Sequence, residues 1–182
     1  MNDRSAAGVP TLETERLSLS AHIPADFDDC AALWSDPRVT EFIGGRPFSR
    51  EETWTRMLRY AGLWPMLGFG YWAVREKASG RFVGDVGFAD YRRSIEPSIA
   101  GQPEIGWVLA PWCHGLGYAT EAVQAALGWS DRRRAGGTVC IIVPEHRRSI
   151  RLAEKVGYRE AGPAVYNGHP MTIFTRPDGL IV

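Results

Sequence analysis

One stretch near the middle of the chain constrains the fold most, because it combines a glycine-rich turn with a helix and two strands. Residues 104–109 predict a strand, Gly115 and Gly117 mark a tight turn, and a strong helix is predicted from about Tyr118 to Trp129. Residues 138–143 carry no charge and are rich in β-branched side chains, which is typical of a strand buried on both faces. Strand, helix and strand in this order make a right-handed crossover, so we expect the two strands to lie parallel in one sheet.

The other segments predict mostly antiparallel neighbours for that parallel pair. Short connections of hairpin type join most of the strands, and hairpins pair antiparallel. We therefore predict an α+β sandwich with a mixed, mostly antiparallel sheet that is flanked by about four helices. The elements expected from periodicity and capping signals are strands at 16–21, 71–75, 82–88, 159–166 and 171–176, helices at 24–35, about 50–61 and 149–156, an apolar connection at 62–70 and a polar loop at 92–102.

Length and composition favour one globular domain. The chain has 182 residues, of which 45% are hydrophobic and 23% are charged, close to the averages of globular proteins. There is no internal repeat and no linker-like segment. We therefore expect a single domain over residues 1–182, with residues 1–12 as a loose leader.

Charge and cysteine content limit the classes of partner and the compartment. The 21 basic and 21 acidic residues cancel, whereas a dedicated nucleic-acid or membrane-surface binder normally shows a basic excess. No apolar run approaches the roughly 20 residues that span a bilayer. Three cysteines without CxxC spacing indicate a reducing, cytoplasmic setting, and the four histidines lack metal-ligand spacing. We expect no nucleic acid, no membrane and no metal.

The glycine turn before the helix is typical of a site that approaches a phosphate group closely. Glycines permit positive φ, and the helix N-terminus supplies unpaired N–H groups with a partial positive charge. A Walker loop would need Gly-Lys-Ser/Thr, which the chain lacks, and a dinucleotide fingerprint would need a third glycine where Thr120 stands. The pyrophosphate of coenzyme A is a third ligand, and a tight turn without a ligand is the structural alternative.

Four segments of the sequence resemble those of a known family. Trp112 to Ala122 resembles the acyl-CoA signature of the GCN5-related N-acetyltransferases (GNAT), in particular the branch typified by the ribosomal-protein N-terminal acetyltransferases (the Rim type). Residues 13–19 resemble the opening strand of the branch, and residues 71–84 resemble its central hairpin. Ser149 to Tyr158 resembles its second cofactor helix. The resemblance covers roughly residues 12–176.

The resemblance implies which residues bind acetyl-CoA. The parallel strands would splay at a bulge, the pantetheine arm would hydrogen-bond the strand that ends in Trp107, Val108 and Leu109, and the Leu109 amide would polarise the thioester. Ser149 would lie near the thiolate. Two interpretations of Arg147, Arg148 and Arg151 stay open, contact with the 3′-phosphate of coenzyme A or a solvated helix end. The resemblance implies that the pyrophosphate is bound by the backbone of His114, Gly115, Leu116, Gly117, Tyr118, Ala119 and Thr120.

Three positions depart from the family's pattern. The signature usually begins with Gln or Arg, where this chain has His114, and the second motif usually has Asn where this chain has His146. Both histidines still offer hydrogen bonds. The tyrosine that many relatives use as general acid is replaced by Ala153, which leaves Ser149 as the candidate that protonates the thiolate.

The implied reaction is acetyl transfer from acetyl-CoA to a primary amine by direct attack in a ternary complex. The amine must be neutral to attack, so a base must collect its proton. Glu104 resembles the Glu of the branch's Glu-Ile-Gly-Tyr/Trp motif and is our candidate for that base, directly or through water. A nucleophilic Cys113 is not required by a thioester donor. The acceptor is a protein N-terminus or a small-molecule amine, the protein is a monomer or a homodimer, and a catalytically weak CoA sensor is the alternative.

The distribution of charge fits this implied function. Residues 132–151 contain six arginines against one acidic residue, Glu145, which is a net charge of +5. The rest of the chain must then carry −5. The basic segment therefore coincides with the part of the chain where the resemblance implies a phosphate-rich cofactor.

Overall fold

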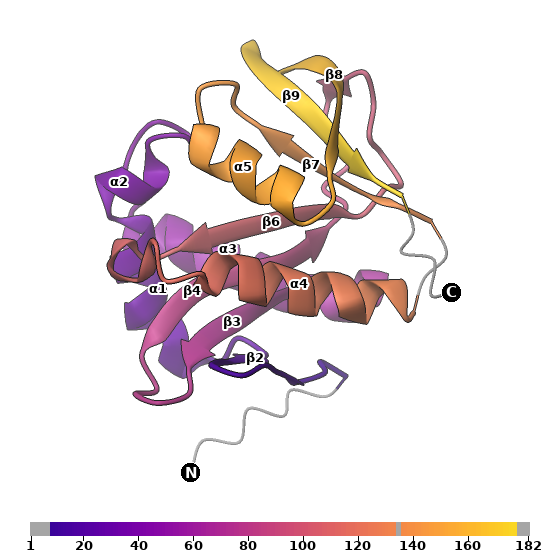
Figure 1. Ribbon diagram of the computed structural model, residues 1–182. Coiled ribbons are helices and arrows are strands. Elements are labelled where there is room, and N and C mark those ends of the chain that lie inside the picture. The colour runs from indigo at the N-terminus through magenta and orange to yellow at the C-terminus, as the bar shows by residue number, and fades with distance from the viewer. Residues whose placement is uncertain (1–7, 134–135, 178–182) are drawn as a thin grey trace.

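The computed structural model describes residues 8–133 and 136–177, whose nine strands form one sheet in the order β1-β2-β3-β4-β6-β7-β9-β8-β5 (Figure 1). All neighbouring strands are antiparallel except β6 and β7, which are parallel, so the predicted mixed sheet is confirmed. The strands are β1 (Leu12–Glu13), β2 (Leu17–Ser20), β3 (Tyr71–Glu76), β4 (Phe82–Ala89), β5 (Ile95–Glu96), β6 (Glu104–Leu109), β7 (Thr138–Ile142), β8 (Arg159–Tyr166) and β9 (His169–Arg176).

Helices cover both faces of the sheet. Helices α4 and α5 pack on one face, and α1 and α3 pack on the other. No helix in the described ranges is long and apolar enough to cross a membrane. The helices are α1 (Phe27–Trp34), α2 (Pro37–Thr40), α3 (Arg50–Leu67), α4 (Tyr118–Asp131) and α5 (Arg147–Lys155), with 3-10 turns η1 (Pro24–Asp26) and η2 (Pro111–Cys113).

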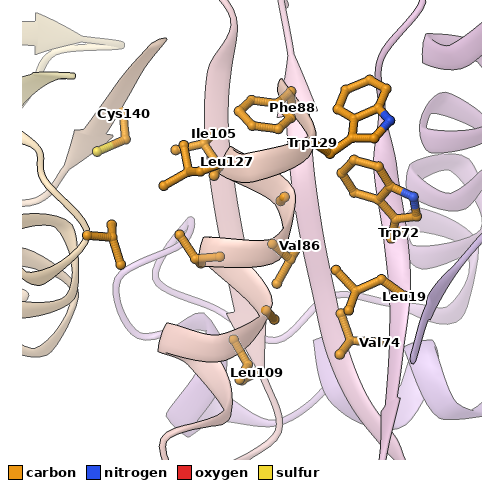
Figure 2. Close-up of a cluster of buried hydrophobic side chains, with 14 of the residues drawn as sticks. Leu19, Trp72, Val74, Val86, Phe88, Ile105, Leu109, Leu127, Trp129 and Cys140 are labelled. Atoms are coloured by element: carbon orange, nitrogen blue, oxygen red, sulfur yellow. The ribbon is translucent and has the colours of Figure 1, made fainter. Parts of the chain in front are cut away.

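The larger core lies between the sheet and α4. Side chains alternate along a strand, and Trp72, Val86 and Ile105 each point from the sheet towards this helix (Figure 2). Leu127 and Trp129 meet them from α4. Full burial of each such side chain stabilises the fold by roughly 1.5–3 kcal/mol, so this core fixes α4 on the sheet.

The opposite face carries a second set of contacts. Cys30 and Trp34 of α1 and Met57 of α3 pack on Ala73 and Phe82 of the sheet. The long loop between β4 and β6, residues 90–103, covers the far part of this face through Ile95 and Ile99. The last residue of β4 and the first residue of β6, on either side of this loop, are paired in the sheet. Their side chains point to the face that α1 and α3 cover.

The parallel pair meets at one point and then separates. The only paired positions of β6 and β7 are Glu104 and Val139, with an additional bond from the Val139 amide to the Pro103 carbonyl at 3.0 Å. Figure 1 shows the two strands diverging from there towards α2. We call the interval between the two backbones the interstrand gap, with a closed end at Glu104 and an open end at Leu109. The expected splay is confirmed, although β6 pairs with β4 in continuous register, without the expected bulge in that ladder.

Helix α3 continues through the segment predicted as an apolar connection. It ends only at Leu67, and Gly68 closes it with φ +74°. The proline that suggested a break, Pro65, lies exposed in the last turn, while Leu63 and Trp64 beside it are buried. Burial of these side chains therefore outweighs the local penalty of the proline.

Two further segments differ from expectation. The predicted polar loop contains a short strand, β5, which pairs with β8 at the sheet's edge. Of the predicted loose leader, residues 1–7 lie outside the described ranges, but Leu12 begins β1 and the Trp72 indole N–H donates to the Pro10 carbonyl at 2.8 Å. The end of the leader is therefore fixed to the sheet.

The start of α4 is tied to the N-terminal strands by a charged cluster. The Glu121 carboxylate accepts hydrogen bonds from the Thr14 hydroxyl at 2.6 Å and from the Arg16 amide and guanidinium, both at 2.8 Å. Arg16 also donates to the Leu116 carbonyl at 2.9 Å. Burial pushes the pKa of Glu121 upward, but these hydrogen bonds outweigh burial and leave it below its ordinary value. The cluster holds the glycine turn against β2.

Candidate active site

The edge of β6 that faces the interstrand gap carries unpaired backbone groups. The Ala110 amide donates to the Val83 carbonyl at 2.8 Å. Together with the register of β4 and β6, this bond shows which residues of β6 direct their backbone groups to β4 and which direct them away. By that alternation Gly106 and Val108 direct their N–H and C=O groups to β4, whereas Trp107 and Leu109 direct theirs into the gap. Of the three strand residues predicted to bind a ligand through the backbone, Val108 is therefore turned away.

The glycine turn has the geometry predicted for it. Gly115 and Gly117 have φ of +82° and +83°, and Gly117 is the N-cap of α4, with no side chain capping the helix. The His114 and Leu116 amides donate within the turn, to Pro111 at 3.2 Å and to Cys113 at 3.3 Å. No hydrogen bond within the turn uses the amides of Gly115, Gly117, Tyr118, Ala119 and Thr120 in this described segment, and amides of this kind at a helix N-terminus favour an anion.

Two side chains of the glycine turn point back into the protein. The Tyr118 hydroxyl donates to Glu76, and the Arg16 guanidinium lies over its ring at 4.7 Å. The His114 ring nitrogen Nε2 lies 3.1 Å from the Leu109 carbonyl oxygen. His114 therefore closes the end of β6, and the turn offers backbone rather than side-chain groups to a ligand.

A side-chain hydrogen bond crosses from β6 to α5. The Trp107 indole N–H donates to the Ser149 hydroxyl at 3.3 Å. Both residues are half-buried. Ser149 therefore lies beside the interstrand gap at the level of Trp107, and its place near a thiolate stays a prediction.

His146 stands at the N-cap of α5 and packs on a residue that follows α2. Its ring stacks on Phe42 with 4.3 Å between ring centroids and 13° between planes. Burial is the main cause that lowers its pKa, so the imidazole is neutral at pH 7. The stack joins the segment after α2 to the start of α5 above the open end of the gap, a contact without a signal in the sequence.

The arginines of the basic segment lie in two separate places. Because β6 and β7 are parallel, the helices that follow them begin at the same end of the sheet. Arg151, in the first half of α5, is exposed there with Arg147 and Arg148. Arg132 and Arg133 follow α4, whose 14 residues span about 21 Å, and Arg134 lies outside the described residues. Among the described arginines of the basic segment, those of α5 lie at the end of the sheet where α4 begins, and Arg132 and Arg133 lie beyond the other end of α4.

Glu104 lies at the closed end of the gap and is bound by an arginine that the sequence did not indicate. Arg93 donates to both carboxylate oxygens, at 2.7 Å from Nε and at 3.0 Å from Nη2. The carboxylate is nearly covered, with 7% of the residue exposed. Glu104 projects to the α1/α3 face, opposite Trp107, because side chains three positions apart along a strand lie on opposite faces.

The Cys113 thiol contacts the backbone rather than the adjacent histidine. Burial raises the pKa of the Cys113 thiol to about 11, and its sulfur lies 3.0 Å from the Ala110 carbonyl oxygen. The fold nevertheless brings together His22, Cys30 and Asp85, whose ligand atoms lie within 4.8 Å of one another, a grouping that spacing along the chain did not predict. Both Asp85 oxygens are engaged there, by His22 at 2.8 Å and by the Trp34 indole at 2.9 Å.

Known proteins resemble this chain in sequence and in fold. Residues 16–159 match the family described as the acetyltransferase (GNAT) domain. The uncharacterized N-acetyltransferase p20 of Bacillus licheniformis is 27% identical over 154 residues, which is 84% of this chain and 84% of p20. A putative GnaT-family acetyltransferase from Bordetella pertussis superimposes with a TM-score of 0.80 at 30% identity, over 92% of this chain and 99% of that one.

The fold also extends to the Rim-type proteins. RimL, a ribosomal L7/L12 α-N-protein acetyltransferase solved in complex with coenzyme A, superimposes with a TM-score of 0.75 at 16% identity, over 92% of this chain and 98% of RimL. The matched part of the sequence covers the glycine turn, both strands of the parallel pair and the start of α5. The chain belongs to the GNAT acetyltransferase family.

Proposed function

We propose that the protein is an acetyl-CoA-dependent N-acetyltransferase that acts on a primary amine. The observation that carries the proposal is the interstrand gap, whose β6 edge presents the backbone N–H and C=O of Trp107 and the N–H of Leu109, with the uncapped start of α4 at its open end. A pantetheine arm contains two amides that pair with such an edge as an added strand does, and a pyrophosphate suits the helix N-terminus. RimL was solved with coenzyme A, which supports the same choice of ligand here.

The reaction that we propose is direct attack of the amine on the thioester. The C–N bond forms as the C–S bond breaks, and the amine proton passes through water to Glu104, which releases it to solvent after the transfer. The leaving thiolate takes the hydroxyl proton of Ser149 as Ser149 takes a proton from a solvent water, so the serine ends the step as a neutral hydroxyl. Because Trp107 donates its indole N–H to Ser149, the serine's own hydrogen remains available for the sulfur. The raised pKa of Cys113 supports a route without an acyl-enzyme.

Spacing along β6 leads us to assign the polarising amide to Trp107 rather than to Leu109. Leu109 stands five residues from Glu104, about 17 Å along the strand, whereas Trp107 stands about 10 Å from it. Ser149 is also hydrogen-bonded to Trp107. In this proposal the Trp107 amide donates to the carbonyl oxygen as negative charge develops on it, and the Leu109 amide binds the pantetheine arm.

The acceptor is the finer part of the proposal. Glu104 projects from the face opposite α4, so the amine approaches from the α1/α3 side while the cofactor lies along the gap. RimL acts on a protein N-terminus. The acceptors that we propose to test are protein N-termini and small-molecule amines.

Two measurements test the function. Acetyl-CoA at 100 times its Kd should stabilise the fold by about 2.7 kcal/mol, and it should raise the melting temperature more than NAD or ATP does. Thiol release from acetyl-CoA should then depend on an amine drawn from a panel of peptides, amino acids and polyamines. An absence of stabilisation would contradict the cofactor assignment, and stabilisation without transfer to any amine would favour the CoA sensor.

A further inference from the structure

The loop between β4 and β6 places one arginine at the closed end of the interstrand gap. Arg93 uses Nε and Nη2 to bind Glu104, at 2.7 and 3.0 Å, and uses Nη1 to donate to the Tyr166 hydroxyl at 3.1 Å. Its guanidinium carbon also lies 4.8 Å from the ring centroid of Tyr91 and 4.9 Å from that of Tyr166. Three separate segments, the loop, β6 and the end of β8, therefore meet on this side chain.

Arg93 is the only charged side chain among the described residues that contacts Glu104. The other titratable groups that interact with Glu104 are Tyr71 on β3, Tyr91 on the loop and Cys140 on β7. Burial is the main cause that raises the pKa of each of these three groups, so all of them are uncharged near neutral pH. The orientation of the Glu104 carboxylate therefore depends on Arg93.

The geometry leaves the carboxylate able to accept a proton. Each oxygen has two lone pairs, and the two N–H groups of Arg93 use one on each oxygen. The remaining lone pairs can accept from water. A bidentate pair of this kind fixes the plane of the carboxylate, which a single contact does not.

We propose that Arg93 is a positioning residue for acetyl transfer, which holds the Glu104 carboxylate in the orientation in which it receives the amine proton through water. This role rests on the proposed N-acetyltransferase function and on Glu104 as its base. Tyr166 belongs to it as well, since its hydroxyl accepts from the third guanidinium nitrogen and links the β8–β9 hairpin to the same carboxylate. Arg93 itself does not touch the reacting atoms.

The test is the pH dependence of kcat/KM for the amine in Arg93→Gln, Arg93→Lys, Glu104→Gln and the double variant Arg93→Gln/Glu104→Gln. A buried carboxylate that loses its opposite charge binds a proton at higher pH, so the acid limb of Arg93→Gln should move up by about 1–3 pH units. Its kcat near pH 6 should fall by roughly 10–100-fold. Arg93→Lys keeps the positive charge but not the two parallel N–H donors of the guanidinium. It should therefore return the acid limb of the pH profile towards that of the wild type, while kcat stays reduced.

The controls separate this role from a loss of structure. Arg92→Gln removes a charge from the adjacent, exposed residue, whose side chain is 83% accessible, and should leave the profile unchanged. The shift in melting temperature with acetyl-CoA should be the same in all variants, which shows that the cofactor site is folded. Arg93→Gln should add no further loss to Glu104→Gln, because the arginine acts through that carboxylate.

Three outcomes would overturn the inference. The acid limb of Arg93→Gln coincides with that of the wild type, or the two substitutions have independent effects, or Glu104→Gln keeps wild-type turnover. In each of them the wild type still transfers acetyl groups, so the proposed function stands. A wild type that transfers acetyl to no amine overturns the function itself and this role with it.

Discussion

All three cysteine side chains are buried, and burial raises the pKa of each thiol. The value for Cys113 is about 11, so only about one molecule in a thousand holds a Cys113 thiolate at pH 8. We therefore expect the native protein to react slowly with a disulfide reagent at pH 8, and to show three reactive thiols per chain after denaturation. A single thiol that reacts quickly in the native protein would restore a cysteine nucleophile to the mechanism.

The hydroxyl of Ser149 is the side-chain proton donor that our mechanism assigns to the thiolate. Ser149→Ala should lower kcat by about 10–100-fold, with a small effect on the Kd for acetyl-CoA, because the hydroxyl acts on the leaving sulfur. Trp107→Phe provides the matched comparison, since it removes the indole N–H and leaves the serine hydroxyl in place. An Ser149→Ala enzyme with wild-type turnover would leave water as the proton donor.

At the residue scale, the sequence indicates which residues belong to the candidate site better than it indicates which way each of them faces. The motif identified Trp107, Leu109 and Ser149 as neighbours of one ligand, and the structure brings Trp107 and Ser149 into contact. The direction of Val108 depends on the phase of the β4–β6 ladder, which only the pairing partner fixes. Arg93 lies in a loop whose sequence has no hydrophobic periodicity, so no local pattern predicted its contact with Glu104.

Among the elements, the glycine turn before α4 offers a test of backbone geometry. Gly115 has φ +82°, and a Cβ built on it would meet no protein atom within 4 Å. Gly115→Ala should cost about 1–2 kcal/mol of stability from the left-handed conformation, and should also weaken acetyl-CoA binding, because in our proposal the pyrophosphate approaches this turn.

The hairpin between β3 and β4 supplies the control for this substitution. Gly80 has φ +70° and equally open surroundings. Gly80→Ala should cost a similar free energy of unfolding, measured by urea denaturation, while the Kd for acetyl-CoA stays that of the wild type. Equal Kd values for the two variants would argue against close approach of a phosphate to the glycine turn.

Elements with a strong periodic pattern could be predicted from the sequence, and those that depend on distant contacts could not. The strands around the parallel pair and helix α4 lie close to their expected bounds. The end of α3 was wrong, because the buried contacts of Leu63 and Trp64 outweigh the signal of Pro65. Strand β5 is stabilised by its pairing with β8. Because it has only two residues, no alternation of polar and apolar side chains could predict it.

For the whole molecule, the neutral total charge resolves into separate regions. The exposed arginines at the start of α5 lie near the glycine turn, whereas Arg132 and Arg133 lie at the other end of α4. Arg151→Gln should raise the KM for acetyl-CoA about two- to five-fold, the size expected of one exposed ion pair. Arg133→Gln removes the same charge far from the turn and should leave this KM unchanged. Similar effects of both variants would indicate a general field instead.

A sheet whose two halves share one pair of residues should also exchange its amide hydrogens unevenly. The Gly106 and Val108 amides are held by β4, while those of Trp107 and Leu109 face the gap. Without cofactor, protection from deuterium should therefore alternate from one residue to the next along β6, and acetyl-CoA should slow exchange at Trp107 and Leu109. Uniform protection of all four amides in the free protein would contradict this pattern. In our proposal the acetyl donor acts as a temporary tenth strand of the nine-stranded sheet, so that its departure after each turnover exposes the edge of β6 to solvent again.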